Sequence, residues 1–161
     1  MTKEEFKNIF NLNFDTVRNY IYYRCGDADL ATDVAQDAFM KIWEKQPIVE
    51  SDKVKALLFK ISSDIFISNY RKQKTALKFT LQAKPQVQSQ NPEEILQFEE
   101  LQSKYNRMLT IMPEKQRVVF LMHRLDGYKY QEIAQRLNLS VKAIEKRMKL
   151  AIEFLRKNLV N

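Results

Sequence analysis

The placing of residues that start and end helices constrains this chain more than any other feature. Its 161 residues include only two glycines and four prolines. Gly26 and Gly127 each follow an apolar run, where a left-handed backbone ends a helix. Thr2 and Glu5 fit a capping box, and Asn91, which precedes a proline, marks another helix start. Because no stretch shows the alternation of a strand, we expect an all-α fold.

These signals separate eight expected helices. Their predicted ranges are 3–12, 14–25, 28–45, 53–73, 92–111, 114–125, 130–137 and 141–158. The stretch 74–91 is rich in glutamine, lacks acidic residues and contains a proline, which is typical of a linker. The alternative is a loop packed on one domain. We therefore expect two small helical domains, 1–73 and 92–161, joined by a flexible linker.

The charge of the chain, +7 in total, is unevenly distributed. Residues 1–46 carry a net charge of −2, residues 53–74 of +5 and residues 114–161 of +6. A basic balance favours an anionic partner, either nucleic acid or a membrane surface. Since the chain has neither an apolar signal core nor a long apolar stretch, we expect a cytoplasmic protein without direct membrane insertion. Two basic zones, one in each domain, indicate two contacts with nucleic acid.

Residue types that common catalytic and metal sites require are scarce. The single Cys25 allows no disulfide within the chain, and the single His123 excludes His-pair metal motifs. Two glycines cannot form a glycine-rich phosphate loop. No local signature of a serine hydrolase is present. We therefore expect no cofactor, no metal site, no catalytic residue and no enzymatic activity.

The strongest local motif, YQEIAQRLNLSVKAIEKRM over residues 130–148, has the pattern of a helix-turn-helix. Ala134 is the small residue where two helices touch, Asn138 suits a left-handed turn, and Ser140 suits the N-cap of the second helix. That helix pairs an apolar stripe with a charged face. The alternative is a solvated face. The DNA contacts expected from this motif are Tyr130, Lys142, Glu145, Lys146 and Lys149.

Helix 28–45 is expected to bury a broad apolar arc, which includes Trp43, and to expose an acidic face. The exposed residues expected on that face are Asp33, Gln36, Asp37 and, as one apolar residue among them, Met40. Phosphate would repel such a face, so it suits a protein partner with a basic or mixed surface. The alternative is again a solvated face.

Helix 53–73 carries aromatic rings beside cations. Single-stranded DNA is bound in this way, because bases stack on rings while cations follow the backbone. The expected contacts are Lys60, Phe66, Tyr70 and Arg71. For each ring taken alone, packing is the commoner role, so Phe59 and Phe66 have the alternative of widening the core.

Three segments in this order resemble the sigma-70 family of transcription-initiation factors, and their arrangement is similar to its extracytoplasmic-function (ECF) group. Residues 30–45, LATDVAQDAFMKIWEK, resemble the stretch that binds core RNA polymerase. Residues 54–74 resemble the helix that recognises the minus-10 promoter element. Residues 112–157 resemble the minus-35-binding domain. The resemblance covers nearly the whole chain.

The resemblance implies roles for single residues in the first domain. Asp33, Gln36 and Asp37 would contact the clamp coiled coil of the largest polymerase subunit. Asp64 stands where the family often has an asparagine near the pocket for a flipped minus-10 base, and Leu57 replaces the usual tryptophan. A carboxylate only accepts hydrogen bonds, so the base preference of Asp64 is open and a structural role is its alternative. The loop 46–53 is the other candidate for the specificity element.

The implied partners are core RNA polymerase, promoter DNA and an anti-sigma factor, which in the family is often membrane-anchored. In the second domain, the lysines and the glutamate named above fall where the family reads minus-35 DNA. Three alternatives remain. They are a helix-turn-helix regulator that is not a polymerase subunit, a small enzyme with an added DNA-binding domain, and a helical interaction protein whose basic faces are only solvated.

Overall fold

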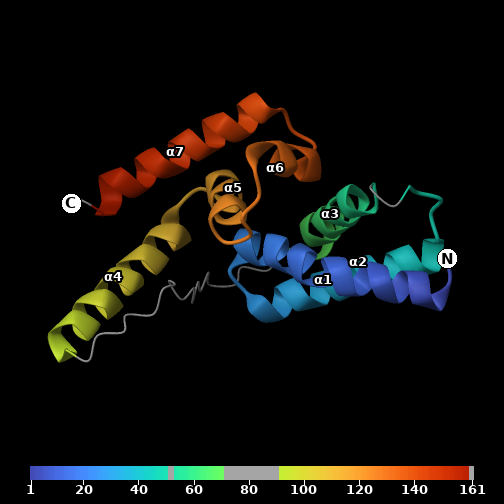
Figure 1. The fold of residues 1–161 in the computed structure, drawn as a ribbon, viewed down its shortest axis with the longest axis horizontal. Helices are drawn as coiled ribbons and strands as arrows, with labels where there is room; N and C mark the ends of the chain where they lie inside the picture. The colour runs from blue at the N-terminus through green and yellow to red at the C-terminus, as the bar shows by residue number, and fades with distance from the viewer. Residues whose placement is uncertain (51–52, 71–90, 160–161) are drawn as a thin grey trace.

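The computed structural model describes residues 1–50, 53–70 and 91–159, and every element within these ranges is helical (Figure 1). The elements are α1 (Lys3–Cys25), α2 (Ala28–Lys45), α3 (Val54–Ile65), the π-helical turn η1 (Phe66–Tyr70), α4 (Pro92–Ile111), α5 (Glu114–Arg124), α6 (Tyr130–Leu137) and α7 (Val141–Leu159). The expected all-α fold is confirmed. The expected linker falls on residues outside the described ranges, apart from its last position.

The expected break between residues 12 and 14 is wrong, because α1 runs from Lys3 to Cys25 without interruption. Asn13 is buried within it, and its side-chain amide donates to the carbonyl of Ile9 at 2.8 Å. The polar side chain is therefore satisfied inside the helix. No glycine or proline interrupts the backbone ladder there, so nothing ends the helix.

The signals at the helix ends act as expected. Thr2 and Glu5 make both bonds of a capping box at the start of α1. Gly26 ends that helix in the left-handed region, with φ of 66°. The side chain of Asn91 accepts from the backbone of Glu93 and starts α4. Each such cap contributes on the order of 1 kcal/mol.

The helices form two bundles. α1, α2, α3 and η1 make the first bundle, and α4 to α7 make the second. The fully buried side chains of the first bundle include Val17, Ile21, Val34, Phe39, Ile42 and Leu58. Those of the second include Leu109, Leu121, Met122, Ile133 and Ile144. The buried side chains of the two bundles together form one continuous hydrophobic core.

The two bundles touch at two places. α1 packs against α5, and α3 packs against α6. In Figure 1, α5 lies between the first bundle and the long helices α4 and α7, which extend away from it. Within the described ranges, no helix combines the length and apolar character needed to cross a bilayer.

Candidate protein and nucleic-acid interfaces

α2 presents a continuous polar face to solvent. Asp33, Gln36 and Met40 are exposed on it, and Asp37 is half-buried. They recur at spacings of three and four residues, so they share one face of the helix. Asp27 starts the helix, because its side chain accepts from two backbone amides of the first turn. The expected acidic face therefore lies on the side of α2 away from the core.

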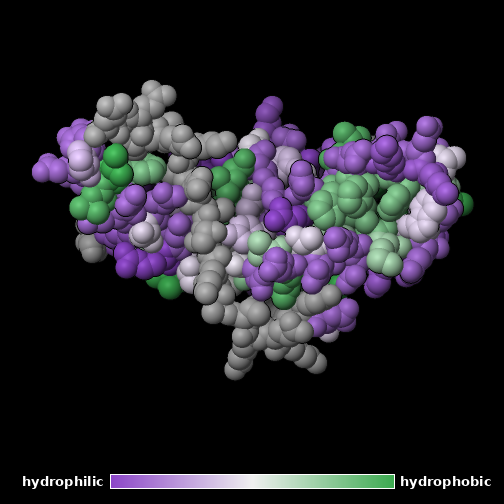
Figure 2. All heavy atoms as spheres, turned by 90° about the horizontal axis from the view of Figure 1, so that it is seen from below, coloured by the Kyte–Doolittle hydropathy of each residue, from purple (hydrophilic) through white to green (hydrophobic). Residues whose placement is uncertain are grey.

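A notch of about 240 Å³ lies at the end of this face. Its lining residues are Lys3, Phe6, Met40, Trp43 and Glu44. Trp43, expected in the buried arc, is 36% exposed, and its ring centroid lies 5.1 Å from that of Phe6. Figure 2 shows apolar atoms ringed by hydrophilic ones at the α1–α2 end of the molecule. An apolar notch beside an acidic face suits a protein partner with an apolar side chain among basic ones.

On α3 and η1, the charged side chains are exposed to solvent and the phenylalanine rings are buried. Lys60 and Asp64 are exposed and one turn apart, whereas Phe59 and Phe66 are buried. Phe66 is 5% exposed, and the guanidinium carbon of Arg24 lies 4.7 Å from its ring centroid. The two phenylalanines therefore pack in the core, as the alternative interpretation has it. The ring of Phe66 is covered in this arrangement.

Two further candidates lie at the end of the same segment. Tyr70 is the last residue of η1, and its side chain is outside the described part. Arg71 also lies outside the described residues. In the loop that precedes α3, Ile48 is fully exposed and the side chains of Glu50 and Lys53 form an ion pair at 3.1 Å.

α6 and α7 form the expected helix-turn-helix. Asn138 ends α6 in the left-handed region, with φ of 53°. The backbone amide of Leu139 donates to the carbonyl of Ala134 at 2.9 Å, which closes the turn. The hydroxyl of Ser140 accepts from the backbone amide of Ala143 at 3.1 Å and caps α7. All the local features expected of this motif are present.

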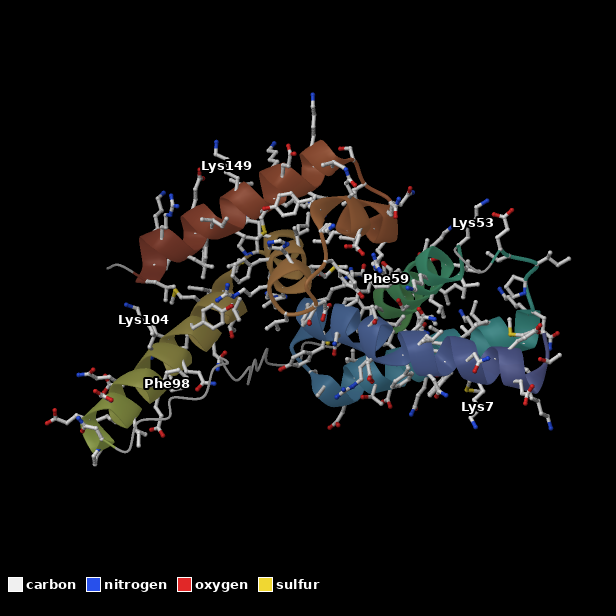
Figure 3. All side chains as sticks on the ribbon, viewed as in Figure 1. Lys7, Lys53, Phe59, Phe98, Lys104 and Lys149 are labelled. Carbon is white, nitrogen blue, oxygen red and sulfur yellow. The ribbon has the colours of Figure 1, made fainter. Side chains whose placement is uncertain are left out.

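α7 separates an apolar face from a charged one. Ile144, Met148 and Ala151 are buried against the bundle. The exposed residues on the opposite side are Lys142, Glu145, Lys146 and Lys149. Figure 3 shows Lys149 pointing away from the rest of the molecule. Tyr130, the first residue of α6, is half-buried. Its ring centroid lies 5.2 Å from that of His123.

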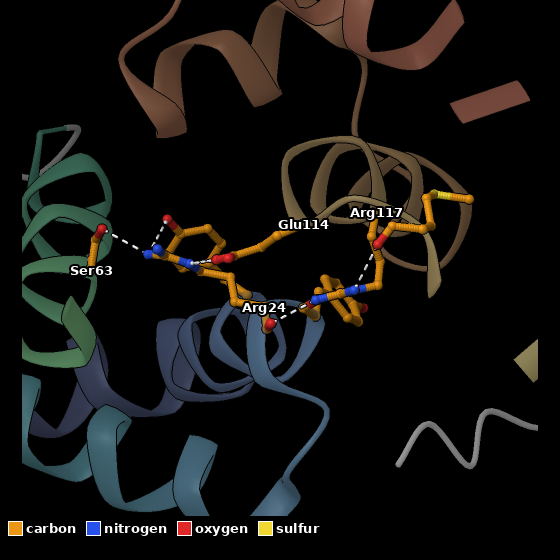
Figure 4. A network of polar contacts seen from close by, with 7 residues as sticks. Arg24, Ser63, Glu114 and Arg117 are labelled. Atoms are coloured by element: carbon orange, nitrogen blue, oxygen red, sulfur yellow. Dashed lines mark hydrogen bonds and ion pairs between the residues drawn. The ribbon is translucent and has the colours of Figure 1, made fainter. Parts of the chain in front are cut away.

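Arg117 is a buried charge that the sequence interpretation missed. It is 2% exposed, and its guanidinium donates to the carbonyls of Tyr23 and Arg24 at 2.7 Å each (Figure 4). It also donates within its own bundle, to the carbonyls of Met112 at 3.0 Å and Leu109 at 3.4 Å. Burial lowers the pKa of Arg117. These bonds join the start of α5 to the end of α1.

The only sequence signal for this role is spacing. Arg117 lies three and four residues before Phe120 and Leu121, on the face that α5 buries. A basic residue on a buried face needs acceptors, but the two acceptors of Arg117 in the first bundle are more than ninety residues away in the chain.

Two side-chain pairs between the bundles add to this contact. The Arg24 guanidinium donates to the Glu114 carboxylate at 2.7 Å, and it is also held within the first bundle by the Ser63 hydroxyl at 2.9 Å (Figure 4). The Tyr23 hydroxyl donates to the Asp126 carboxylate at 2.8 Å. Burial is the main cause that raises the pKa of both Tyr23 and Asp126. The two bundles are therefore joined by polar contacts as well as by packing.

A groove of about 540 Å³ separates α3 from the helix-turn-helix turn. The polar residues that line it include Lys60, Ser63 and Asp64 from α3 and Gln135, Arg136 and Asn138 from the second bundle. Two of the candidate residues for single-stranded DNA, Lys60 and Asp64, therefore face the second bundle.

Comparison with known proteins gives consistent similarities over both bundles. The family model described as Sigma-70 region 2 matches residues 9–75, and that described as Sigma-70, region 4 matches residues 103–155. The ferric citrate uptake sigma factor FecI of Escherichia coli (strain K12) is 26% identical, over 92% of this chain and 87% of FecI. The ECF RNA polymerase sigma factor SigW of Bacillus subtilis (strain 168) is 23% identical, over 98% of this chain and 90% of SigW.

The fold is also similar to that of a solved structure, the sigma factor RpoE from Bartonella quintana, crystallised in complex with the anti-sigma factor NepR. The TM-score is 0.65 at 23% sequence identity, and the match covers 98% of each chain.

Proposed function

Because this chain belongs to the sigma-70 family, in its ECF group, we propose that it binds core RNA polymerase and directs transcription initiation at promoters. The observation that carries the proposal is the exposed polar face of α2, with its apolar notch, in a chain that also holds a helix-turn-helix. A DNA-binding regulator that acts without polymerase has no need of such a face.

The polymerase contact is assigned to α2. Asp33 and Gln36 accept hydrogen bonds from basic side chains of the clamp coiled coil, and Asp37 adds charge at the edge. Met40, which is 58% exposed, and the notch beside it receive an apolar side chain of the same partner. Complementary charge speeds and orients the encounter, while burial of the apolar side chain slows dissociation.

The duplex contact is assigned to the charged face of α7. Lys142, Lys146 and Lys149 bind phosphates or guanine edges in the major groove of the minus-35 element, and Glu145 accepts from a cytosine amine. Tyr130 lies at the start of α6, where a half-buried ring can contact the adjacent backbone. Phosphate contacts orient the domain, while base contacts select the sequence.

The single-strand contact is assigned to α3. Lys60 follows the backbone of the opened minus-10 strand, and Asp64 accepts from a flipped base. Tyr70 and Arg71 extend this contact along the chain. Flipping a base costs a few kcal/mol, which binding in a pocket must offset. Phe66 takes part only if its ring leaves the core position that it has here.

The remaining parts of the proposal concern chemistry, location and regulation. Sigma factors are regulatory subunits of polymerase, and we propose that this chain has no enzymatic activity and acts in the cytoplasm. Among the described residues, no group of three or more His, Cys, Asp or Glu side chains could hold a metal ion. The complex of the related RpoE with NepR supports an anti-sigma partner for this chain as well.

The polymerase contact is tested by measuring the affinity of core polymerase for the double variant Asp33→Ala, Gln36→Ala. Both side chains are exposed, so the fold is kept, while binding is expected to weaken about tenfold or more. Asp15→Ala, which removes an exposed carboxylate from α1, is the matched control and should bind as the wild type does.

Unchanged core affinity in the double variant would show that the α2 face is not the polymerase contact. If the wild-type chain binds duplex promoter sites but not core polymerase, the helix-turn-helix regulator is the better interpretation.

A further inference from the structure

His123, the single histidine of the chain, has no role in the function proposed above. It lies near the end of α5, and its side chain is exposed. Its Nδ1 lies 2.8 Å from the carbonyl oxygen of Tyr128, and its ring meets that of Tyr130 edge to face. The imidazole is therefore held in one orientation beside the first residue of the helix-turn-helix.

The contact with Tyr128 determines which ring nitrogen of His123 carries a hydrogen. A carbonyl oxygen only accepts, so Nδ1 is the donor. In the neutral ring Nε2 is then an acceptor, and an acceptor cannot bind a phosphate oxygen. In the protonated ring Nε2 becomes a donor, and the ring gains a positive charge. The exposed edge of this ring can therefore bind a phosphate only when it is protonated.

The ring lies where the phosphates of a bound duplex are expected. In a helix-turn-helix, the first helix crosses the DNA backbone while the second lies in the major groove. α6 is that first helix, and Tyr130 stands at its N-terminal end, where the helix dipole is positive. Arg124 and Lys129, which are exposed, add positive charge on either side in the sequence. A phosphate beside Tyr130 is therefore within reach of His123.

The acidic groups of the elements that pack on α5 have other partners. On α6, the Glu132 carboxylate accepts from the backbone at the start of the helix at 3.1 Å and lies 3.8 Å from Arg136. Asp126 accepts from a tyrosine of α1. The charged residues of α7 are exposed, apart from the half-buried Arg147. In the part of the chain that the structure describes, no carboxylate forms an ion pair with His123.

We propose that His123 is a pH-sensitive contact of the helix-turn-helix with the DNA backbone, in which the protonated ring donates from Nε2 to a phosphate oxygen. Histidine changes its charge between about pH 5 and pH 8, whereas lysine, arginine and phosphate diesters keep theirs. The chain therefore holds duplex DNA more tightly at mildly acidic than at mildly basic pH. The proposal rests on the proposed function in taking α6 and α7 as the duplex-binding pair.

The contact is tested by measuring the affinity of the full chain for a mixed-sequence DNA duplex at about pH 6 and about pH 8, over a series of salt concentrations. Phosphate contacts carry no sequence information, so the promoter need not be known. Each contact adds about 0.9 to the slope of log affinity against log salt. The wild type should bind about tenfold more tightly at the lower pH, with a slope steeper by about one.

Two variants of His123 separate its charge from its shape. His123→Gln keeps a donor for the carbonyl of Tyr128 but gains no charge, so its affinity and slope should be the same at both pH values. His123→Arg carries a permanent charge and should have the steeper slope at both. Because His123 is exposed, both variants keep the fold. Lys7→Gln is the matched control, since Lys7 lies on α1 and points away from the second bundle (Figure 3). It should keep the pH dependence of the wild type.

Three results would overturn the proposal. Equal affinities and slopes of the wild type at the two pH values would show that His123 does not bind phosphate in either form. A pH dependence that persists in His123→Gln would assign the effect to another titrating group. Equal weakening of His123→Gln at both pH values would make His123 a structural support of Tyr130. In each case the duplex still binds, so the proposed function stands. A wild type that binds no duplex at either pH would instead remove the duplex contact from the proposed function, and this proposal with it.

Discussion

Arg117 is a charge buried among backbone carbonyls. The last carbonyls of a helix lack partners within it and lie at the negative end of its dipole. The guanidinium supplies both hydrogen bonds and positive charge to the end of α1. Removing one member of such a group leaves the other buried without a partner, which costs more than the pair contributes.

Asp126 is the opposite case, a carboxylate whose charged form is destabilised by burial. Burial raises its pKa, and this effect exceeds the lowering by Tyr23, Asn19 and Arg136. The charged form is therefore less stable in the folded chain than in water. We predict that Asp126→Asn raises the free energy of unfolding by about 1 kcal/mol, because the amide oxygen still accepts from Tyr23. Chemical denaturation of the variant and the wild type measures this change.

The burial of Asp126 also determines the direction in which pH changes the stability of the chain. Since the pKa of Asp126 is raised in the folded chain, folding takes up a proton, and the contribution of Asp126 to the free energy of unfolding should grow as the pH falls from neutrality toward that pKa. The stability difference between Asp126→Asn and the wild type should therefore shrink on mild acidification. A difference that grows instead would contradict the sign.

At the residue scale, the sequence predicts which side chains are exposed better than it predicts which polar side chains are buried. Asp33, Met40 and Lys146 are exposed as expected, because helical periodicity alone determines which face a residue occupies. Arg117 and Asp126 could not be predicted, because their partners lie in the other bundle. Phe66 packs in the core, where the Arg24 side chain also covers its ring.

At the element scale, the helix-turn-helix depends on local chemistry. Ser140 accepts from the backbone of Ala143 at the start of α7. We predict that Ser140→Ala destabilises the start of α7 by about 1 kcal/mol. This corresponds to amide exchange there that is about fivefold faster. Hydrogen–deuterium exchange of the full chain measures it.

Ser103→Ala is the control for this change, because Ser103 is exposed in the middle of α4 and caps nothing. Its effect should stay within about 0.5 kcal/mol. Equal exchange at α7 in the two variants would mean that the Ser140 cap contributes nothing.

Element boundaries were predictable where a capping residue marks them. α2 and α4 have the expected ranges, since Asp27 and Asn91 start them. The break expected near residue 13 is absent, and the Asn13 side chain there bonds to the turn of α1 before it. The change from α3 to η1 has no marker in the sequence, because neither glycine nor proline stands there.

At the scale of the whole molecule, the sequence predicts two helical groups but not how they meet. Charge and periodicity assign faces to single helices, whereas the packing of α1 on α5 and of α3 on α6 depends on contacts between distant segments. The result is a chain whose duplex-binding face is exposed on α7, while Lys60 and Asp64 are exposed in a groove between α3 and the second bundle.

The most direct measurement is run-off transcription on fragmented genomic DNA with core polymerase from the source organism, with and without this chain. We predict transcripts that start at defined sites only when the chain is present. The double variant Asp33→Ala, Gln36→Ala should yield fewer of them, and Asp15→Ala should match the wild type. The absence of any start site that depends on the wild-type chain would contradict its assignment as an initiation factor.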